Sequence, residues 1–138
     1  MKRFLFSTLL ILPVVLSVPV KADSPKAWFE SRGFDVAACE VDIDVAEPGG
    51  TFFSISLVNP FTTDVRLGYW QKSKSRIRIY KSIEPNVPGK WRVQDWDKFY
   101  VLDVVNRRCI NTLRFVYADE GKTIKLSRGM DEESDPLP

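Results

Sequence analysis

Basic residues recur at every second position in one short segment of the chain. The segment is residues 71–82, "QKSKSRIRIYKS", and the alternating positions are Lys72, Lys74, Arg76, Arg78 and Tyr80. In an extended strand, alternate side chains share one face of the sheet. A row of ammonium and guanidinium groups on one face can hold an anionic partner by charge. The pattern therefore predicts a basic stripe that could bind a phosphate-rich glycolipid or an acidic protein.

Two structural interpretations of this stripe compete with binding. Glu40, Asp42 and Asp44 alternate in "CEVDIDV", so a neighbouring acidic strand could form an internal salt ladder with the stripe, at about 0.2–1 kcal/mol per exposed pair. The stripe could instead be a solvated edge strand that its lysines protect from aggregation. Because apolar alternation starts only at Ile77, we expect "QKSKS" to be a turn and the strand to begin near Arg76.

Two tryptophans follow on opposite faces of another expected strand, "KWRVQDW". Trp91 shares a face with Val93, whereas Trp96 shares the other face with Arg92. Only one of these faces can point into a core, so one tryptophan is a candidate for an exposed ring that recognises a carbohydrate or a peptide. The candidate binding residues are Lys72, Lys74, Arg76, Arg78, Tyr80, Trp91 and Trp96.

The residue types argue against catalysis and against a metal or cofactor. The chain has no histidine and two cysteines, so the usual zinc ligand sets and the Ser-His and Cys-His nucleophile systems are absent. Asp95 and Asp97 are close in sequence, but alternating carboxylates on a strand are usually a solvated face. "ADEG" at 118–121 lacks the spacing of a calcium loop and reads as a hairpin turn with Gly121 at positive φ. We expect no catalytic residue and no cofactor.

The two cysteines, Cys39 and Cys109, are expected to form a disulfide. Closing a loop of about 70 residues would stabilise the fold by roughly 4 kcal/mol in the chain-entropy model. Since Cys39 opens an early strand and Cys109 a late one, the disulfide is expected to tie the two sheets together or to fasten adjacent strands near one rim.

The chain divides into three parts by composition. Residues 1–22 resemble a signal peptide, with Lys2 and Arg3 before an apolar stretch and a cleavage site after Ala22. Residues 23–127 are one domain, and residues 128–138 are an acidic tail without periodicity. No later stretch is apolar enough to span a membrane. We therefore expect a protein exported to the periplasm or the cell exterior.

The rest of the domain is expected to be an antiparallel, Ig-like β-sandwich or a small barrel. Residues 23–34 read as a short helix that Asp23 or Ser24 caps and Gly33 ends. Seven or eight short strands follow at spacings of roughly ten residues. They are expected in "CEVDIDV", which forms a hairpin with "TFFSISLV", and then in "DVRLGYW", "RIRIYKS", "KWRVQDW", "KFYVLDVV", "CINTLRFVY" and "KTIKLS".

Part of the sequence resembles a loose group of small exported bacterial β-rich proteins of unknown function. A strand ends in Leu57-Val58-Asn59, a turn leads to a strand with Tyr69, Trp91 follows, and the run from Cys109 to Asp119 closes the pattern. Glu120 precedes Gly121 where the group has Asp-Gly. The resemblance implies an exported β fold and assigns no activity.

These features predict a non-enzymatic binding module that recognises a protein or an anionic envelope component through the basic stripe. A small-ligand or glycan-binding sandwich is the alternative, and a hydrolase is the least favoured class. Without residues 1–22 the chain carries 17 basic and 18 acidic residues, so nucleic acid is not an expected partner. A homo-oligomer, with the basic strand facing the acidic strand of a second copy, is left open.

Overall fold

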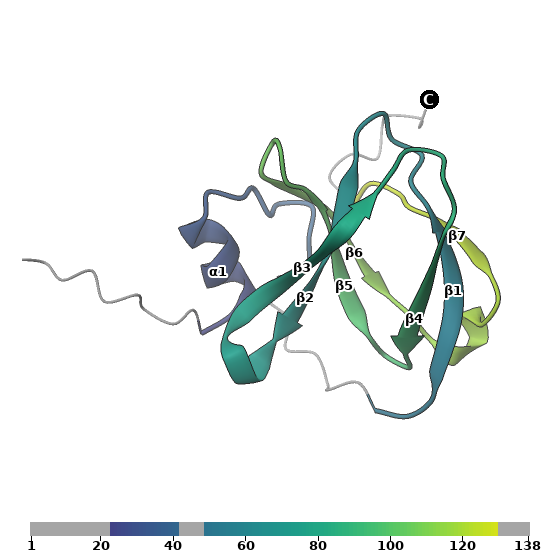
Figure 1. The fold of residues 1–138 in the computed structure, drawn as a ribbon. Helices are drawn as coiled ribbons and strands as arrows, with labels where there is room; N and C mark the ends of the chain where they lie inside the picture. The colour runs from purple at the N-terminus through teal and green to yellow at the C-terminus, as the bar shows by residue number, and fades with distance from the viewer. Residues whose placement is uncertain (1–22, 42–48, 130–138) are drawn as a thin grey trace, which may run out of the picture.

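A computed structural model describes residues 23–41 and 49–129 of the chain (Figure 1). The expected signal peptide and most of the acidic tail lie outside the described residues, as do Asp42 and Asp44. The described part contains one α-helix, two short 3-10 helices and seven strands. These elements are α1 (Pro25–Ser31), β1 (Phe52–Val58), β2 (Val65–Gln71), η1 (Lys72–Lys74), β3 (Arg76–Ile83), β4 (Gly89–Gln94), β5 (Lys98–Asp103), β6 (Arg108–Arg114), η2 (Tyr117–Asp119) and β7 (Thr123–Lys125).

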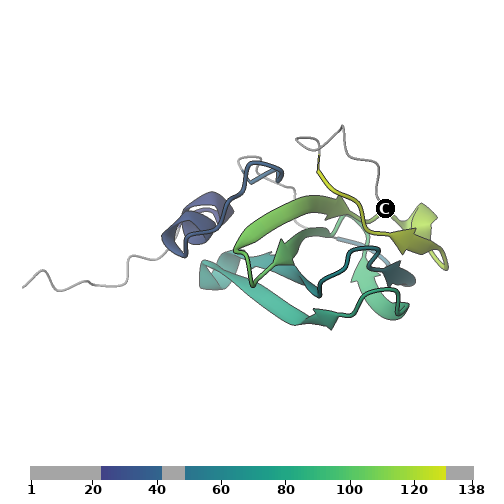
Figure 2. The same ribbon diagram turned by 90° about the horizontal axis from the view of Figure 1, so that it is seen from above.

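The strands form two sheets that pack face to face (Figures 1 and 2). One sheet has the strand order β3-β2-β5-β6, and the other has the order β4-β1-β7. All neighbours are antiparallel except β1 and β7, which are parallel. The expected all-β sandwich with one short helix and one disulfide is confirmed. No helix within the described ranges is both long and apolar enough to cross a membrane.

Alternating side chains fill the space between the two sheets. In β1 the inward residues are Phe53, Ile55 and Leu57, and each is almost completely buried. They meet Phe99 and Val101 from β5 in one apolar cluster. This period of two is the pattern expected for a strand with one buried face.

The helix α1 adds a third layer on the outer face of the four-stranded sheet (Figure 2). Ser24 caps α1 by accepting a hydrogen bond from the Ala27 N–H, and Gly33 follows at φ +74°. Both features are as the sequence indicates. Phe29 is fully buried and contacts Tyr100 of β5 edge-on, with ring centroids 5.2 Å apart. A second apolar cluster therefore covers the face of β5 that points away from the other sheet.

The disulfide fastens this third layer to the sheet. Cys39 is bonded to Cys109 of β6, with Cα atoms 6.1 Å apart. Residues 39–41 are not in a strand, so the expected strand from Cys39 is wrong in its described part. The disulfide consequently joins a coil segment to β6 and does not tie the two sheets. The rest of the expected strand and the turn of the expected hairpin before β1 lie outside the described residues, within which β1 pairs with β4 and β7.

An irregularity in β3 changes which core its side chains enter. The register with β2 shifts between the pairs Arg66–Ser82 and Gly68–Ile79. Before the shift, Ile77 and Ile79 face the α1 layer, and after it Ile83 faces the other sheet. An extra residue in one strand reverses its inward and outward alternation, which explains how one strand serves both cores.

The loop between β3 and β4 is held by one buried amide. Asn59 is fully buried, and its Nδ2 donates to the carbonyls of Thr63 and Ile83. Its backbone carbonyl accepts a hydrogen bond from the Asn86 N–H at 2.8 Å. These bonds fix the crossing from one sheet to the other, so β3 and β4 lie along the same side of the sandwich (Figure 1).

We predict that the variant Cys39→Ala/Cys109→Ala folds but loses about 2–4 kcal/mol of unfolding free energy, because the bridge closes a loop with a sequence separation of 70. Urea unfolding followed by tryptophan fluorescence measures this loss. Wild type under reducing conditions is the matched control and should show the same midpoint. An unchanged midpoint in both samples would contradict the assignment of a stabilising role.

Candidate functional site

The structure places the predicted basic residues at the free side of one sheet. Lys72 and Lys74 lie in η1, the turn that joins β2 to β3, and Arg76 and Arg78 lie on β3. The strand begins at Arg76, as the sequence indicates. All four side chains are exposed, and β3 has β2 as its single strand neighbour within the described residues. We use the name basic edge for Lys72, Lys74, Arg76 and Arg78 together with Tyr80 and Trp91.

The cross-strand partners of the arginines are not acidic. Arg76 lies opposite Gln71, to whose Oε1 it donates a hydrogen bond of 3.0 Å, and Arg78 lies opposite Tyr69. No ion pair links a cation of the basic edge to a carboxylate of the described residues. The arginines therefore keep their charge available on this side of the molecule.

Glu40 lies elsewhere and cannot form the expected salt ladder. Its N–H donates to Thr112 Oγ1 of β6, and its carbonyl accepts from Lys98 Nζ of β5. Since β2 separates these strands from β3, the interpretation of Glu40 as a partner of the basic stripe is wrong. Asp42 and Asp44, the other two proposed partners, lie outside the described residues.

Two aromatic rings complete the basic edge. The Arg78 guanidinium lies 4.7 Å from the centroid of the Tyr80 ring, a distance at which a cation is attracted to a ring face. Tyr80 in turn meets Trp91 of β4 edge-on at 5.8 Å. Trp91 and Tyr80 are partly buried against the inter-sheet cluster. Arg78 is thus held over a ring that the core itself supports.

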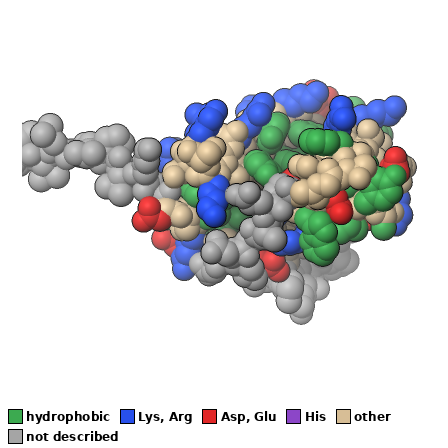
Figure 3. Space-filling view, turned by 90° about the horizontal axis from the view of Figure 1, so that it is seen from below, with side chains coloured by type: hydrophobic (Ala, Val, Ile, Leu, Met, Phe, Trp, Pro, Cys, Tyr) green, Lys and Arg blue, Asp and Glu red, His purple; other side chains and the backbone are tan. Residues whose placement is uncertain are grey.

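Figure 3 shows the molecule from below, with basic side chains in a row along one edge and hydrophobic side chains toward the centre. The row follows the side on which β3 and β4 lie in Figure 1. The structure therefore brings together six of the seven predicted binding residues, Lys72, Lys74, Arg76, Arg78, Tyr80 and Trp91, as one edge with the two lysines at its turn.

Trp96 lies apart from this edge, in the turn between β4 and β5. It is 51% exposed, and the Arg114 guanidinium is 5.8 Å from its ring centroid. Its φ is +71°, a left-handed conformation that is rare for a bulky side chain. The Trp96 N–H donates to the Phe115 carbonyl at 2.8 Å, which holds the turn in this conformation.

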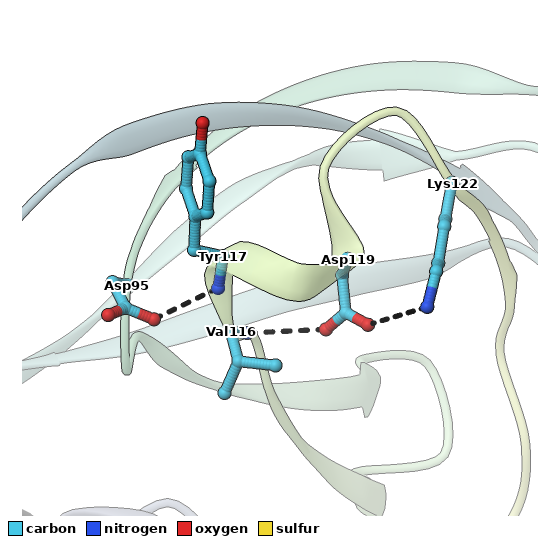
Figure 4. A network of polar contacts seen from close by, with 5 residues as sticks. All are labelled: Asp95, Val116, Tyr117, Asp119 and Lys122. Atoms are coloured by element: carbon cyan, nitrogen blue, oxygen red, sulfur yellow. Dashed lines mark hydrogen bonds and ion pairs between the residues drawn. The ribbon is translucent and has the colours of Figure 1, made fainter.

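The carboxylates near this turn are engaged by backbone groups. Asp95 accepts from the Tyr117 N–H, and Asp119 accepts from the Val116 N–H and lies 3.8 Å from Lys122 Nζ (Figure 4). Asp97 accepts from the Gln94 N–H at 2.7 Å. These carboxylates therefore hold turns. The turn at Gly121 does have φ +74°, but it joins β6 and β7 of different sheets, so the expected hairpin is wrong.

Burial shifts the pKa values of Asp97, in the turn before β5, and of two residues on β5. It raises the pKa of Asp97, against a smaller lowering by the hydrogen bond from Gln94. Burial also lowers the pKa of the Lys98 ammonium, and it raises the pKa of Tyr100 to about 12 with a contribution from the charge of Glu40. Lys98 donates to the Glu40 carbonyl and faces the Tyr100 ring, so it acts as a structural clamp.

No protein-family model matches this chain, and no curated protein matches it. Within residues 23–41 and 49–129, no three His, Cys, Asp or Glu side chains are grouped so that they could hold a metal ion.

One cationic surface escaped the sequence reasoning. Lys90 and Arg92 of β4 and Lys125 of β7 point outward from the smaller sheet. The signal was present, because Lys90 and Arg92 flank Trp91 and must therefore face away from it.

We predict that Trp96→Gly is more stable than Trp96→Ala by about 1 kcal/mol, because glycine adopts positive φ without the Cβ clash that alanine keeps. Chemical unfolding of the two variants measures the difference. Both variants lack the ring and its contact with Arg114, so the difference in their stability reports the backbone strain at position 96. Equal stabilities would show that the turn carries no such strain.

The raised pKa of Asp97 predicts a pH-dependent stability. The folded state binds this proton more tightly than the unfolded state, so the contribution of Asp97 is fully present below its unfolded pKa and is lost as the pH rises through the folded pKa. Asp97→Asn should therefore gain stability relative to wild type as the pH rises from acid to neutral. Thermal midpoints across this range test it, with Asp95→Asn as the control. If the thermal midpoints of wild type and Asp97→Asn changed in parallel with pH, the raised pKa of Asp97 would be refuted.

Proposed function

We propose that this protein is an exported, non-enzymatic binding module that captures an acidic, extended segment of a partner protein along the basic edge. The supporting observation is the edge position of β3, where exposed arginines face no carboxylate of the described residues. A periplasmic or secreted accessory factor or inhibitor is the kind of protein that this role implies.

The free edge of β3 supplies main-chain groups for such a partner. In an antiparallel pair, half of the N–H and C=O groups of an edge strand point away from its neighbour. A partner strand that adds to this edge gains main-chain hydrogen bonds, while pockets and charges for alternate side chains provide specificity.

The side chains of β3 favour an acidic partner with a regular spacing. Arg76 and Arg78 lie on one face, two residues apart, and strand geometry separates them by roughly 6–7 Å. Acidic residues at alternate positions of an added strand have the same spacing and would face both guanidinium groups. Tyr80 continues the face with a ring that supports Arg78.

Export is consistent with the disulfide between Cys39 and Cys109, because disulfides persist in oxidising compartments. The sequence of residues 1–22 motivates this part of the proposal, and that segment lies outside the described residues.

The test uses a fluorescently labelled ten-residue peptide of alternating Asp and Val, titrated with the mature protein at low ionic strength. Arg78→Glu is expected to weaken binding by about tenfold, which corresponds to about 1.4 kcal/mol, because it replaces attraction by repulsion at the centre of the edge. Fluorescence anisotropy measures the dissociation constants.

Arg66→Glu is the matched control. Arg66 is an exposed arginine on the neighbouring strand β2, and it lies opposite Leu102, whose side chain faces the α1 layer. The same charge change at Arg66 should alter binding by less than about twofold, since it lies on the other face. If Arg66→Glu and Arg78→Glu weakened peptide binding equally, the effect would be one of net charge alone, and the proposal would be overturned.

A further inference from the structure

The outer face of the smaller sheet is a second cationic surface with its own geometry. We use the name outer face for the residues of β1, β4 and β7 that point away from the core. They are Phe52, Ser54, Ser56, Val58, Lys90, Arg92, Gln94, Thr123 and Lys125.

The strand register fixes how these side chains lie. Lys90, Ser56 and Thr123 are direct neighbours across the three strands and form one row. Arg92 lies opposite Ser54 in the next row, and Lys125 lies opposite Val58 on the other side. Hydroxyl groups therefore occupy the centre of the face, with cations on both flanks.

The outer face carries positive charge without compensation from its own residues. None of its residues is acidic, and within the described residues Lys90, Arg92 and Lys125 form no ion pair. A solvated sheet surface gains stability when opposite charges lie directly across from each other. Here serine lies opposite each of the two β4 cations, so no carboxylate of the outer face neutralises them and both can contact an anionic ligand.

We propose that the outer face binds a linear anionic polysaccharide, such as a sulfated or phosphorylated glycan. Ser54, Ser56 and Thr123 supply hydroxyls that donate to and accept from sugar hydroxyls and anionic oxygens. Lys90 and Arg92 on one side and Lys125 on the other contact the anionic groups, with their strands about 10 Å apart. A chain lying along β1 meets all of these groups.

Two other polyanions fit this surface less well. Single-stranded nucleic acid is held by aromatic rings on which bases stack, whereas the single ring of the outer face, Phe52, already has the Arg92 guanidinium 5.0 Å from its centroid. A lipid bilayer is bound by a face whose apolar side chains enter it, and here the centre of the face is hydroxylic. Sugar rings with anionic substituents use both the hydroxyls and the cations.

The test titrates the mature protein with a heparin octasaccharide by calorimetry at low ionic strength. Lys90→Ala/Arg92→Ala is expected to weaken binding by about tenfold or more, because it removes two charged hydrogen-bond donors from one flank. Lys125→Ala on the other flank should weaken binding by about fivefold, and Ser54→Ala/Ser56→Ala by about twofold to fivefold. Circular dichroism checks that each variant is folded.

The matched control is Arg76→Ala/Arg78→Ala, which removes the same net charge from the basic edge. The affinity of this variant for the octasaccharide should stay within about twofold of the wild-type affinity, whereas its binding of the acidic peptide should be lost. Lys90→Ala/Arg92→Ala should show the reverse pattern. The inference is independent of the proposed function, and this crossed pattern separates failure of one from failure of the other.

Four results would overturn the inference. They are absence of octasaccharide binding, equal losses in the two double variants, equal binding of uncharged dextran, and tighter binding of a ten-nucleotide oligothymidylate than of the octasaccharide. Where octasaccharide binding is absent, capture by phosphatidylglycerol vesicles would assign the face to a membrane surface.

Discussion

The fold depends on a strand that is buried on both of its faces. Phe99 and Val101 of β5 point into the space between the sheets, whereas Tyr100 and Leu102 point the opposite way, under α1. A strand of this composition is stable only if both faces are covered, because each exposed apolar side chain forfeits about 1.5–3 kcal/mol of burial. The helix, the coil after it and the disulfide are therefore parts of the core. They complete a three-layer structure whose middle layer is the four-stranded sheet.

The doubly buried strand β5 begins and ends with a charged residue that is itself buried. Lys98 is buried and satisfies its ammonium group with the Glu40 carbonyl, and Asp103 accepts from the backbone and side chain of Asn106. A buried charged group is tolerated when hydrogen bonds replace the water that it loses. Lys98 also bonds the coil at Glu40 to the sheet, so it reinforces the covalent link at Cys39.

Much of this architecture could be predicted from the sequence, and the failures share a physical cause. Alternation identified the strands and the start of β3 at Arg76, and capping and turn residues identified the helix, because these signals act over a few neighbouring positions. Alternation within a strand indicates which of its side chains share a face, but it does not indicate which other strand lies next to it in the sheet. The choice of Glu40 as an ionic partner and of a hairpin at Gly121 required that missing information. The split of β3 between two cores was equally hidden, since a register shift is a property of the strand pair.

The disulfide between Cys39 and Cys109 also bears on the order in which the molecule can be assembled. A chain is synthesised from its N-terminus, so Trp28 and Phe29 exist before the strands that cover them. The cysteine that secures their layer arrives 70 residues after its partner. The segment that carries Trp28 and Phe29 is thus locked in place only after Cys109 has been made, and until then its layer lacks the covalent link to the sheet.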